Sequence, residues 1–438
     1  MTESPEQEPA APGPPSRRSG ALSVRLCRDP RDFAGLRAEW QALQRRCATA
    51  TPFQSHAWLL SWWLSYGGGG RLRVVLVRRG GVLIAAAPLM LVHRPMPLLV
   101  PMGGQISDFG DILVDDEQAE TAITALERGL HRAARHAVIE LREVRPGAAA
   151  ERLYEAWTGA RRRLADSVCL ELPAVPVEEI LKRLPAAKAQ RARAGLGKID
   201  ALKIEDCAVP EHEVPAAVDH LLRLRETQRR GSGVRSNAVE HHEPRLAEHL
   251  ARAIRRMVRD GEASLTEFRL DGEVVAAGVA LHSGYLTGSY LHGAHPGLKE
   301  KGVDVTTLLL RHEVELAAST GRQVLSLLRG DEPYKNHWRP RAVINQRLLL
   351  APSGLDAVLR LRASQAARRE STAGTVGARF PATPSFDPAL PLVHGATFTA
   401  GRLVAGVRKR LRGGAQARVP HPAPPVAVAE VTQAVRER

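Results

Sequence analysis

Cysteine is scarce in this chain of 438 residues, and the few cysteines present form no recognisable frame. There is neither a CxxC pair nor the dense spacing of a small secreted domain among the four positions, which are Cys27, Cys47, Cys169 and Cys207. Such scattered thiols exclude a fold built on disulfides, and we expect them to be reduced in a cytoplasmic protein. A catalytic cysteine is not expected either.

Long apolar runs are also missing. The longest one, residues 82–92, ends at His93 and is far shorter than the roughly 20 residues that a helix needs to cross a bilayer. Residues 1–20 are rich in proline and polar side chains and lack the apolar core of a secretory signal. We therefore expect no transmembrane helix, and a disordered N-terminus over residues 1–20.

Acidic residues are outnumbered, with 47 Asp and Glu against 62 Lys and Arg, which leaves a net charge of +15. Residues 356–438 hold 13 Lys and Arg against 5 Asp and Glu, a surplus of 8. This Pro- and Arg-rich basic tail is expected to be partly disordered, and it could touch an anionic membrane surface or nucleic acid weakly. No aromatic residue interleaves the charged run at 406–414, which favours a solvated extension instead.

One C-terminal segment predicts three antiparallel strands, a crossover helix and one further strand. Its first hairpin is marked by Asp271-Gly272, a dipeptide that supplies the positive backbone angles of a tight turn. Apolar residues then recur at helical spacing over 305–320, and residues 323–328 read as a short strand. A crossover of this kind returns the last strand parallel to the strand before the helix, so antiparallel order becomes mixed order.

A cofactor cleft is expected where these two parallel strands part, because backbone groups left unpaired there can bond to a ligand. The preceding loop, residues 295–302, adds Lys299, Lys301 and Gly302 immediately before the helix N-terminus. Positive side chains and helix amides together are suited to gripping a pyrophosphate. A solvated turn would have the same composition, so this loop alone does not decide the matter.

The first half of the chain repeats the element order of the second. Strands are expected at 73–78, 82–91, 111–114 and 138–142, with a helix over 118–135. The sequence therefore predicts an α/β protein of two domains, residues 21–175 and 176–355, each with a mixed antiparallel and parallel sheet flanked by helices. No residue-level repeat is visible, so the duplication is inferred from element order.

Three segments, together with this sheet, carry a resemblance to a known superfamily: FQSHAWLLSWWLSYG at 53–67, RVVLVRRGGVLIAAAPLML at 73–91 and RGDEPYKNHW at 329–338. The chain resembles the GNAT N-acyltransferases over roughly residues 22–350. More narrowly, it is similar to the bacterial CelD-like acyltransferases and to the tandem FemAB-like transferases. One departure is that Gly302-Val303-Asp304 stands where the family usually has a Pro-Gly-like turn.

The resemblance implies tandem GNAT-like domains and an acyl-CoA donor. Backbone amides at His292, Gly293 and Ala294 would donate to the thioester oxygen, as the bulged fourth strand of the superfamily does. Tyr334 would protonate the departing thiolate, and Lys335, within a Gly-x-Glu-x-Tyr-Lys-like pattern, would face the substrate or developing negative charge.

Two pairs of acidic residues have open roles. Asp331 and Glu332 could serve as a base through water, or simply hold Lys335 in place. Asp108 and Asp111 could face the acceptor across the domain cleft, although capping a turn explains them equally well.

Other side chains carry weaker signals. His292 and His295 could act as a base or as metal ligands, but no third and fourth ligand follow at suitable spacing, so no metal is expected. The tryptophans at 58, 62 and 63 share one helix, and core packing is the favoured explanation for them.

The sequence thus predicts an acyl-CoA-dependent N-acyltransferase that acts on an amine, on a sugar or an envelope precursor. Two alternatives stay open. The donor could be an aminoacyl-tRNA, as in FemAB-like proteins, or the chain could be a non-catalytic module that binds anionic polymers.

Overall fold

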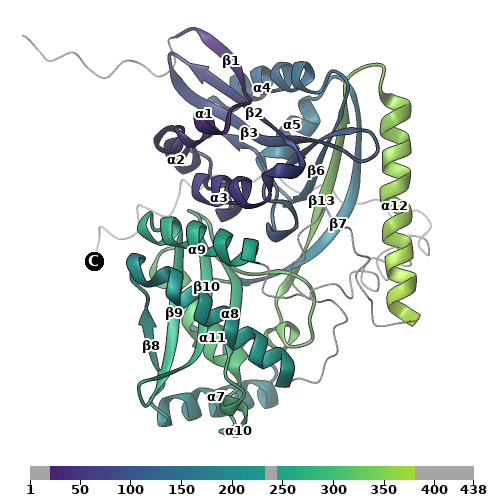
Figure 1. Ribbon diagram of the computed structural model, residues 1–438. Coiled ribbons are helices and arrows are strands. Elements are labelled where there is room, and N and C mark those ends of the chain that lie inside the picture. The colour runs from purple at the N-terminus through teal and green to yellow at the C-terminus, as the bar shows by residue number, and fades with distance from the viewer. Residues whose placement is uncertain (1–19, 232–243, 380–438) are drawn as a thin grey trace, which may run out of the picture.

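The computed structural model describes residues 20–231 and 244–379, and one 13-stranded mixed sheet runs through both halves of the molecule (Figure 1). The strand order is β1-β2-β3-β4-β6-β13-β7-β12-β11-β10-β9-β8, with β5 paired to β3. The N-terminal half contains β1 (Leu22–Cys27), α1 (Pro30–Ala34), α2 (Arg37–Arg45), α3 (His56–Tyr66), β2 (Arg71–Arg79), β3 (Val82–His93), β4 (Pro97–Pro101), β5 (Leu113–Val114), α4 (Ala119–Ala133), β6 (Val138–Val144), α5 (Ala149–Ala156) and β7 (Ala160–Pro173).

The C-terminal half continues with α6 (Val177–Lys182), α7 (Ala186–Ala201), β8 (Glu205–Ala208), α8 (Val214–Gly231), α9 (Pro244–Arg259), β9 (Ala263–Leu270), β10 (Glu273–His282), β11 (Leu286–Ala294), α10 (Gly297–Glu300), α11 (Val305–Ser319), β12 (Val324–Arg329), β13 (Arg341–Ala351) and α12 (Asp356–Arg379). The predicted mixed α/β fold and its element order are confirmed. The hairpin between β9 and β10 turns at Asp271 and Gly272, whose φ angles are 52° and 84°. Both angles are positive, as the dipeptide predicts.

Each half contains the same antiparallel strands followed by a parallel pair. β4 pairs with β6 in the first half, and β11 pairs with β12 in the second. A helix lies between the two strands of each pair along the chain, α4 in the first half and α11 in the second. This agreement supports the duplication inferred from element order.

The last strands of the two halves are exchanged. β13, which follows the C-terminal half along the chain, lies between β6 and β7 of the N-terminal half. β7 in turn pairs antiparallel with β12. A division of the chain at residues 175 and 355 therefore cuts through one continuous sheet, and β13 belongs with the N-terminal half that the sequence analysis did not assign it to.

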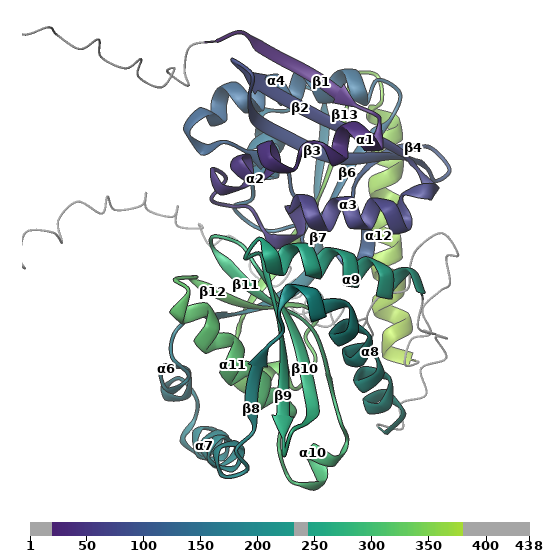
Figure 2. The same cartoon turned by 60° about the vertical axis from the view of Figure 1, so that its left-hand side comes forward.

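Helices and aromatic side chains join the halves across one face of the sheet. Figure 2 shows α3 of the first half beside α9 of the second. Trp58 is fully buried, with its ring centroid 5.2 Å from that of Tyr290 on β11 and 4.6 Å from that of His249 on α9. The predicted packing role of this tryptophan is thus confirmed, and it places the start of α3 against β11.

Residues 356–379 of the expected tail form α12, which runs along one side of the molecule (Figure 1). The remainder of that tail, residues 380–438, and nearly all of the predicted disordered N-terminus lie outside the described residues. Within residues 20–231 and 244–379, no helix is both long enough and apolar enough to cross a membrane.

Candidate active site

The two parallel strands of the C-terminal half part after a short stretch of pairing. β11 and β12 are in register only from Leu286, opposite Val324, to Gly288, opposite Ser326. β11 then continues to Ala294, so its edge facing β12 is released from the ladder over its second half. Backbone groups on such an edge are available to a ligand. The gap predicted from the sequence is therefore present in the backbone.

A β-bulge in β11 marks this gap, but two residues earlier than predicted. Ser289 pairs with Ala280 and Leu291 pairs with Val279, so Tyr290 is the extra residue. The predicted amide donors, His292, Gly293 and Ala294, are instead in regular register with β10. Gly293 also lies against the backbone of α8, where an added Cβ would be 2.6 Å from the amide nitrogen of Arg225. The oxyanion contact expected at 292–294 stays a prediction, and the bulge lies just before these residues.

Leu328 fills the start of the gap. A Cβ placed on Gly288 would lie 3.0 Å from Leu328 Cδ2, so the leucine side chain covers that glycine closely. Leu328 has a φ of 57°, a left-handed conformation that costs a branched residue about 1–3 kcal/mol. This conformation turns the chain away from β11 at the end of β12. The part of the β11 edge that is not paired with β12 therefore begins beyond Gly288, at Ser289.

A short turn after β12 brings Tyr334 to the freed edge. The ring centroids of Tyr334 and His292 are 6.5 Å apart with an interplanar angle of 83°. Tyr334 is 37% exposed, and burial together with the Glu332 carboxylate raises the pKa of its phenol well above the ordinary value. The phenol is consequently protonated at neutral pH and able to donate. Burial, with Arg225 and Lys335 nearby, lowers the pKa of His292 to about 4, so its imidazole is neutral.

Lys335 is held by two short contacts. It is 6% exposed, and its Nζ lies 2.8 Å from the carbonyl oxygen of Arg329 and 2.8 Å from Glu332 Oε2. Asp331 accepts a bond from Asn336 Nδ2 through its backbone oxygen at 3.2 Å. Glu332 is therefore the counter-ion of Lys335. This contact agrees with the alternative in which Glu332 holds Lys335 in place. Lys335 fixes the turn that carries Tyr334.

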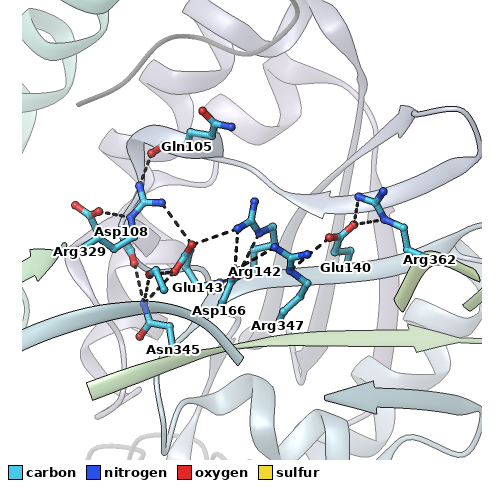
Figure 3. Close-up of polar contacts among 11 residues, drawn as sticks. Gln105, Asp108, Glu140, Arg142, Glu143, Asp166, Arg329, Asn345, Arg347 and Arg362 are labelled. Carbon is cyan, nitrogen blue, oxygen red and sulfur yellow. Dashed lines mark hydrogen bonds and ion pairs between the residues drawn. The ribbon is translucent and has the colours of Figure 1, made fainter. Parts of the chain in front are cut away.

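Arg329, the last residue of β12, reaches into the N-terminal half (Figure 3). Its guanidinium forms an ion pair with Asp108 and donates to the carbonyl oxygen of Gln105, and it lies 3.4 Å from Glu143 Oε1. Asn345 Nδ2 donates to Glu143 Oε2 at 3.1 Å and to the Asp108 carbonyl oxygen at 3.4 Å. Asp108 therefore lies at the junction of the halves, as expected, but its carboxylate is bound to Arg329.

This junction continues as a row of alternating charges. Figure 3 shows the ion pairs passing between β6, β7, β13 and α12, through Arg142, Asp166, Arg347, Glu140 and Arg362. Both Asp166 and Glu140 have side chains that are almost fully buried. Sequence analysis missed this network, because its members come from strands far apart along the chain and share no motif.

Asp111 has a structural role, in contrast to the acceptor-binding role that the sequence left open. It is buried, and its carboxylate oxygens accept backbone N–H groups of Ile112 at 2.8 Å, Ala149 at 3.1 Å and Ala150 at 2.8 Å. The last two amides belong to the first turn of α5, so Asp111 supplies that helix with a cap. A substrate cannot reach it without unfolding this turn.

Most backbone amides of the loop before α11 are already bonded within the loop. Residues 297–300 form the short helix α10, and the amides of Lys299, Lys301 and Gly302 bond to carbonyl oxygens within the loop at 2.8–3.1 Å. Asp304 caps α11, with its carboxylate accepting from the amides of Thr306 at 3.3 Å and Thr307 at 3.2 Å. The amides of Lys299, Lys301, Gly302, Thr306 and Thr307, which belong to the expected cradle, are thus bonded internally.

Three lysine side chains lie on or beside the loop before α11. The side chain of Lys198 on α7 lies against Gly302, whose φ is 68°. Lys299 and Lys301 are exposed on the same loop. By contrast, the equivalent helix of the N-terminal half, α4, follows Asp116 and Glu117 and carries Glu120 in its first turn. The segment before the crossover helix is therefore basic in the C-terminal half and acidic in the N-terminal half.

Residues 186–336 match the family model of the acetyltransferase (GNAT) domain. No curated protein matches the chain. The chain is similar to the crystal structure of FemX, with a TM-score of 0.54 and 12% identity over 71% of this chain and 95% of that one. A conserved protein of unknown function from Bacteroides thetaiotaomicron gives a TM-score of 0.46 with 10% identity over 75% of this chain and 100% of that one.

A tandem GNAT protein from the clavulanic acid biosynthesis pathway gives a TM-score of 0.37, with 13% identity over 76% of this chain and 100% of that one. At these identities the likeness to FemX concerns the fold alone, and the two lower scores add no argument. The class is thus a mixed α/β protein of GNAT fold. More particularly, residues 186–336 of its C-terminal half match the model of the GNAT acetyltransferase domain, and Tyr334 lies near the end of the matched region.

Proposed function

We propose that this chain is an acyl-CoA-dependent N-acyltransferase, in which the C-terminal half holds the donor and the N-terminal half shapes the acceptor cleft. The observation that carries the proposal is the parting of β11 from β12 beside Tyr334, inside the segment that matches the GNAT acetyltransferase model. GNAT domains generally use acyl-CoA as donor. An amine on a sugar or an envelope precursor is the acceptor that the CelD-like resemblance implies.

In this proposal the acyl group lies along the freed edge of β11. Backbone amides at the Tyr290 bulge polarise the thioester oxygen, because a bulge leaves donors out of the ladder. The acceptor nitrogen attacks the thioester carbon, the carbon–sulfur bond breaks, and the thiolate takes the phenolic proton of Tyr334. The phenol is suited to this step because it stays protonated until the thiolate forms.

The phosphates of the donor would be held by the side chains of Lys198, Lys299 and Lys301. Asp304 already accepts from the amides of Thr306 and Thr307, so the first turn of α11 offers fewer amides to a phosphate. The Asp304 carboxylate also stands near the expected pyrophosphate and repels it.

This repulsion favours one alternative donor. An aminoacyl-tRNA, which the FemAB-like resemblance implies, presents no pyrophosphate to the N-terminus of α11. The Asp304 cap is the specific observation in its favour, whereas the match to the acetyltransferase model supports acyl-CoA.

Isothermal titration with coenzyme A and with charged tRNA separates the two donors. For the acyl-CoA proposal we expect one coenzyme A site per chain, weakened by at least about tenfold when Lys299 and Lys301 are replaced by glutamate. Lys188→Glu, an exposed lysine at the start of α7, is the matched control and should leave affinity unchanged. Binding of charged tRNA but not of coenzyme A would replace this proposal with the alternative.

A further inference from the structure

Polar side chains gather beneath the C-terminal sheet, on the face covered by α11, where an apolar core is the rule. A small cavity lies there between β9, β10 and α11, and its polar lining is Ser264, Thr266, His312 and Glu313. The size of the cavity is comparable to that needed for about one water molecule. A polar cavity inside a core requires an explanation, because buried polar groups cost stability unless they are bonded.

Glu313 is the most unusual member of this cluster. It is 5% exposed, and its Oε1 accepts a bond from Ser289 Oγ at 3.0 Å. Within the part of the chain that the structure describes, no basic side chain forms an ion pair with it. Burial raises its pKa to about 7, although the Ser289 bond opposes the rise. The carboxyl can therefore gain and lose a proton near neutral pH.

The far side of the cavity leads to solvent. His312 Nε2 lies 3.0 Å from Thr266 Oγ1, and His312 Nδ1 lies 2.9 Å from Asp206 Oδ2. The Asp206 side chain is 58% exposed. Thr266 and Glu313 both line the cavity, so one water bonded to the Glu313 carboxyl and the Thr266 hydroxyl would complete a hydrogen-bonded path from Glu313 through His312 to the surface.

The near side leads to the candidate active site. Ser289 directly precedes the bulge residue Tyr290 and is the first residue of β11 beyond its pairing with β12. Glu313 is also close enough to Tyr334 for its charge to raise the pKa of that phenol. Glu313 thus touches, through Ser289, the strand along which the proposed donor lies.

Acyl transfer releases a proton that must leave this site. An ammonium acceptor and a thioester give an amide, a thiol and one proton: the nitrogen–carbon bond forms, the carbon–sulfur bond breaks, and Tyr334 supplies the thiol proton. Tyr334 is then restored by one of the two protons that the ammonium nitrogen loses, and the other is released to solvent. The site therefore needs a base near neutral pKa and an exit.

We propose that Glu313 receives this proton through the Ser289 hydroxyl and passes it by way of the cavity to His312 and Asp206 at the surface. The inference rests on the proposed function and adds a proton-transfer role for four residues outside the Tyr334–Lys335 turn. His292 is less suited to the task, because its imidazole accepts a proton only near pH 4.

Few other titrating groups face Glu313. From α11 there is His312, and from β10 there is His282, whose ring nitrogens bond to Thr287 Oγ1 at 3.1 Å and Ser264 Oγ at 3.1 Å. Burial lowers the pKa of His282 to about 4, so it does not titrate near pH 7 in the folded protein. Tyr334 and Asp206 complete the set, and burial raises the pKa of Tyr334 well above its ordinary value, so its phenol stays neutral in that range.

The test is the pH dependence of kcat/KM for acyl transfer from acetyl-CoA. In the wild type we expect the rate to rise with pH through about 7 and then level. Glu313→Gln should lower the plateau on the order of 100-fold and remove this limb, and Glu313→Asp should restore part of both. Glu315→Gln, an exposed glutamate on the same helix, is the control and should keep the wild-type profile.

Ser289→Ala retains the Glu313 carboxyl but breaks its hydrogen bond to β11, so this variant tests the proton route if Glu313→Gln fails to fold. Its kcat/KM should likewise no longer rise with pH through about 7. A wild-type enzyme that transfers acyl groups, with the same limb in both variants, overturns the proton route alone. A wild type that transfers nothing from any acyl-CoA contradicts the proposed function instead.

Discussion

Arg329 joins the two halves through Asp108 and Glu143, two largely buried carboxylates. We expect Arg329→Ala to lower the free energy of unfolding by about 3–5 kcal/mol, because it leaves buried charges without a partner. Urea denaturation measures this loss. The matched control is Arg25→Ala, which breaks the exposed pair with Asp32 and should cost less than about 1 kcal/mol. Equal losses in the two variants would show that the junction does not depend on Arg329.

Glu313 should also make stability depend on pH. Its pKa is raised from an ordinary 4.5 to about 7 in the folded protein, so the protonated carboxyl favours the fold. That stabilisation is fully present below about pH 4.5 and is lost as the pH rises through 7. Relative to Glu313→Gln, the wild type should therefore lose up to about 3 kcal/mol between pH 5 and pH 8. Thermal unfolding of both proteins across this range checks it, and parallel curves would contradict it.

At the residue scale, the sequence predicted residues that belong to a motif better than residues whose role depends on burial. The RGDEPYKNHW segment led to Tyr334 and Lys335, because its residue types and spacing are visible in the sequence. Glu313 gave no signal, since a glutamate on an amphipathic helix reads as solvated until the fold shows which face is covered. The partners of Arg329 were equally hidden, because the order of strands in the sheet brings Glu143 to Arg329 and Asn345 to Glu143.

At the element scale, local chemistry predicted well what is locally determined. The Asp271-Gly272 turn and the helical spacing after Gly302 placed β9, β10 and α11 within a few residues. The bulge at Tyr290 and the left-handed Leu328 were not predictable, because both depend on how β11 meets its neighbours. The bulge therefore lies two residues before the amides that the sequence predicted as donors.

The Asp304 cap of α11 gives a prediction at the same scale. Asp304→Asn keeps a side-chain oxygen for the amides of Thr306 and Thr307 but removes a negative charge from the expected pyrophosphate site. Coenzyme A should bind about 2–5-fold more tightly to this variant, with little change in the melting temperature. Asp304→Ala should instead destabilise the protein by about 1 kcal/mol. Titration calorimetry and thermal melts measure both, and weaker binding by Asp304→Asn would place the phosphates elsewhere.

At the scale of the whole molecule, the exchange of β7 and β13 makes the halves interdependent. Sequence order suggested two separable domains, but the register of β13 with both β6 and β7 is a long-range property that no local pattern encodes. Such an exchange buries the edges that each half would otherwise expose.

Fragments test this interdependence. We expect residues 176–355 alone to aggregate or remain unfolded, because β12 and β13 would both lose β7 as a neighbour. A chain ending after residue 379 should instead stay monodisperse and bind coenzyme A as the full chain does. Size-exclusion chromatography and circular dichroism distinguish these outcomes. A well-folded C-terminal fragment would show that strand exchange is dispensable.

Hydrogen–deuterium exchange of the full chain, with and without acetyl-CoA, tests the central claim most directly. The account predicts slower exchange in the second half of β11, residues 289–294, and in the turn at 330–338. Exchange in β4 and β6, the parallel pair of the N-terminal half, should not change. Protection confined to the N-terminal half, or none in β11 at saturating acetyl-CoA, would contradict a donor site between β11 and β12.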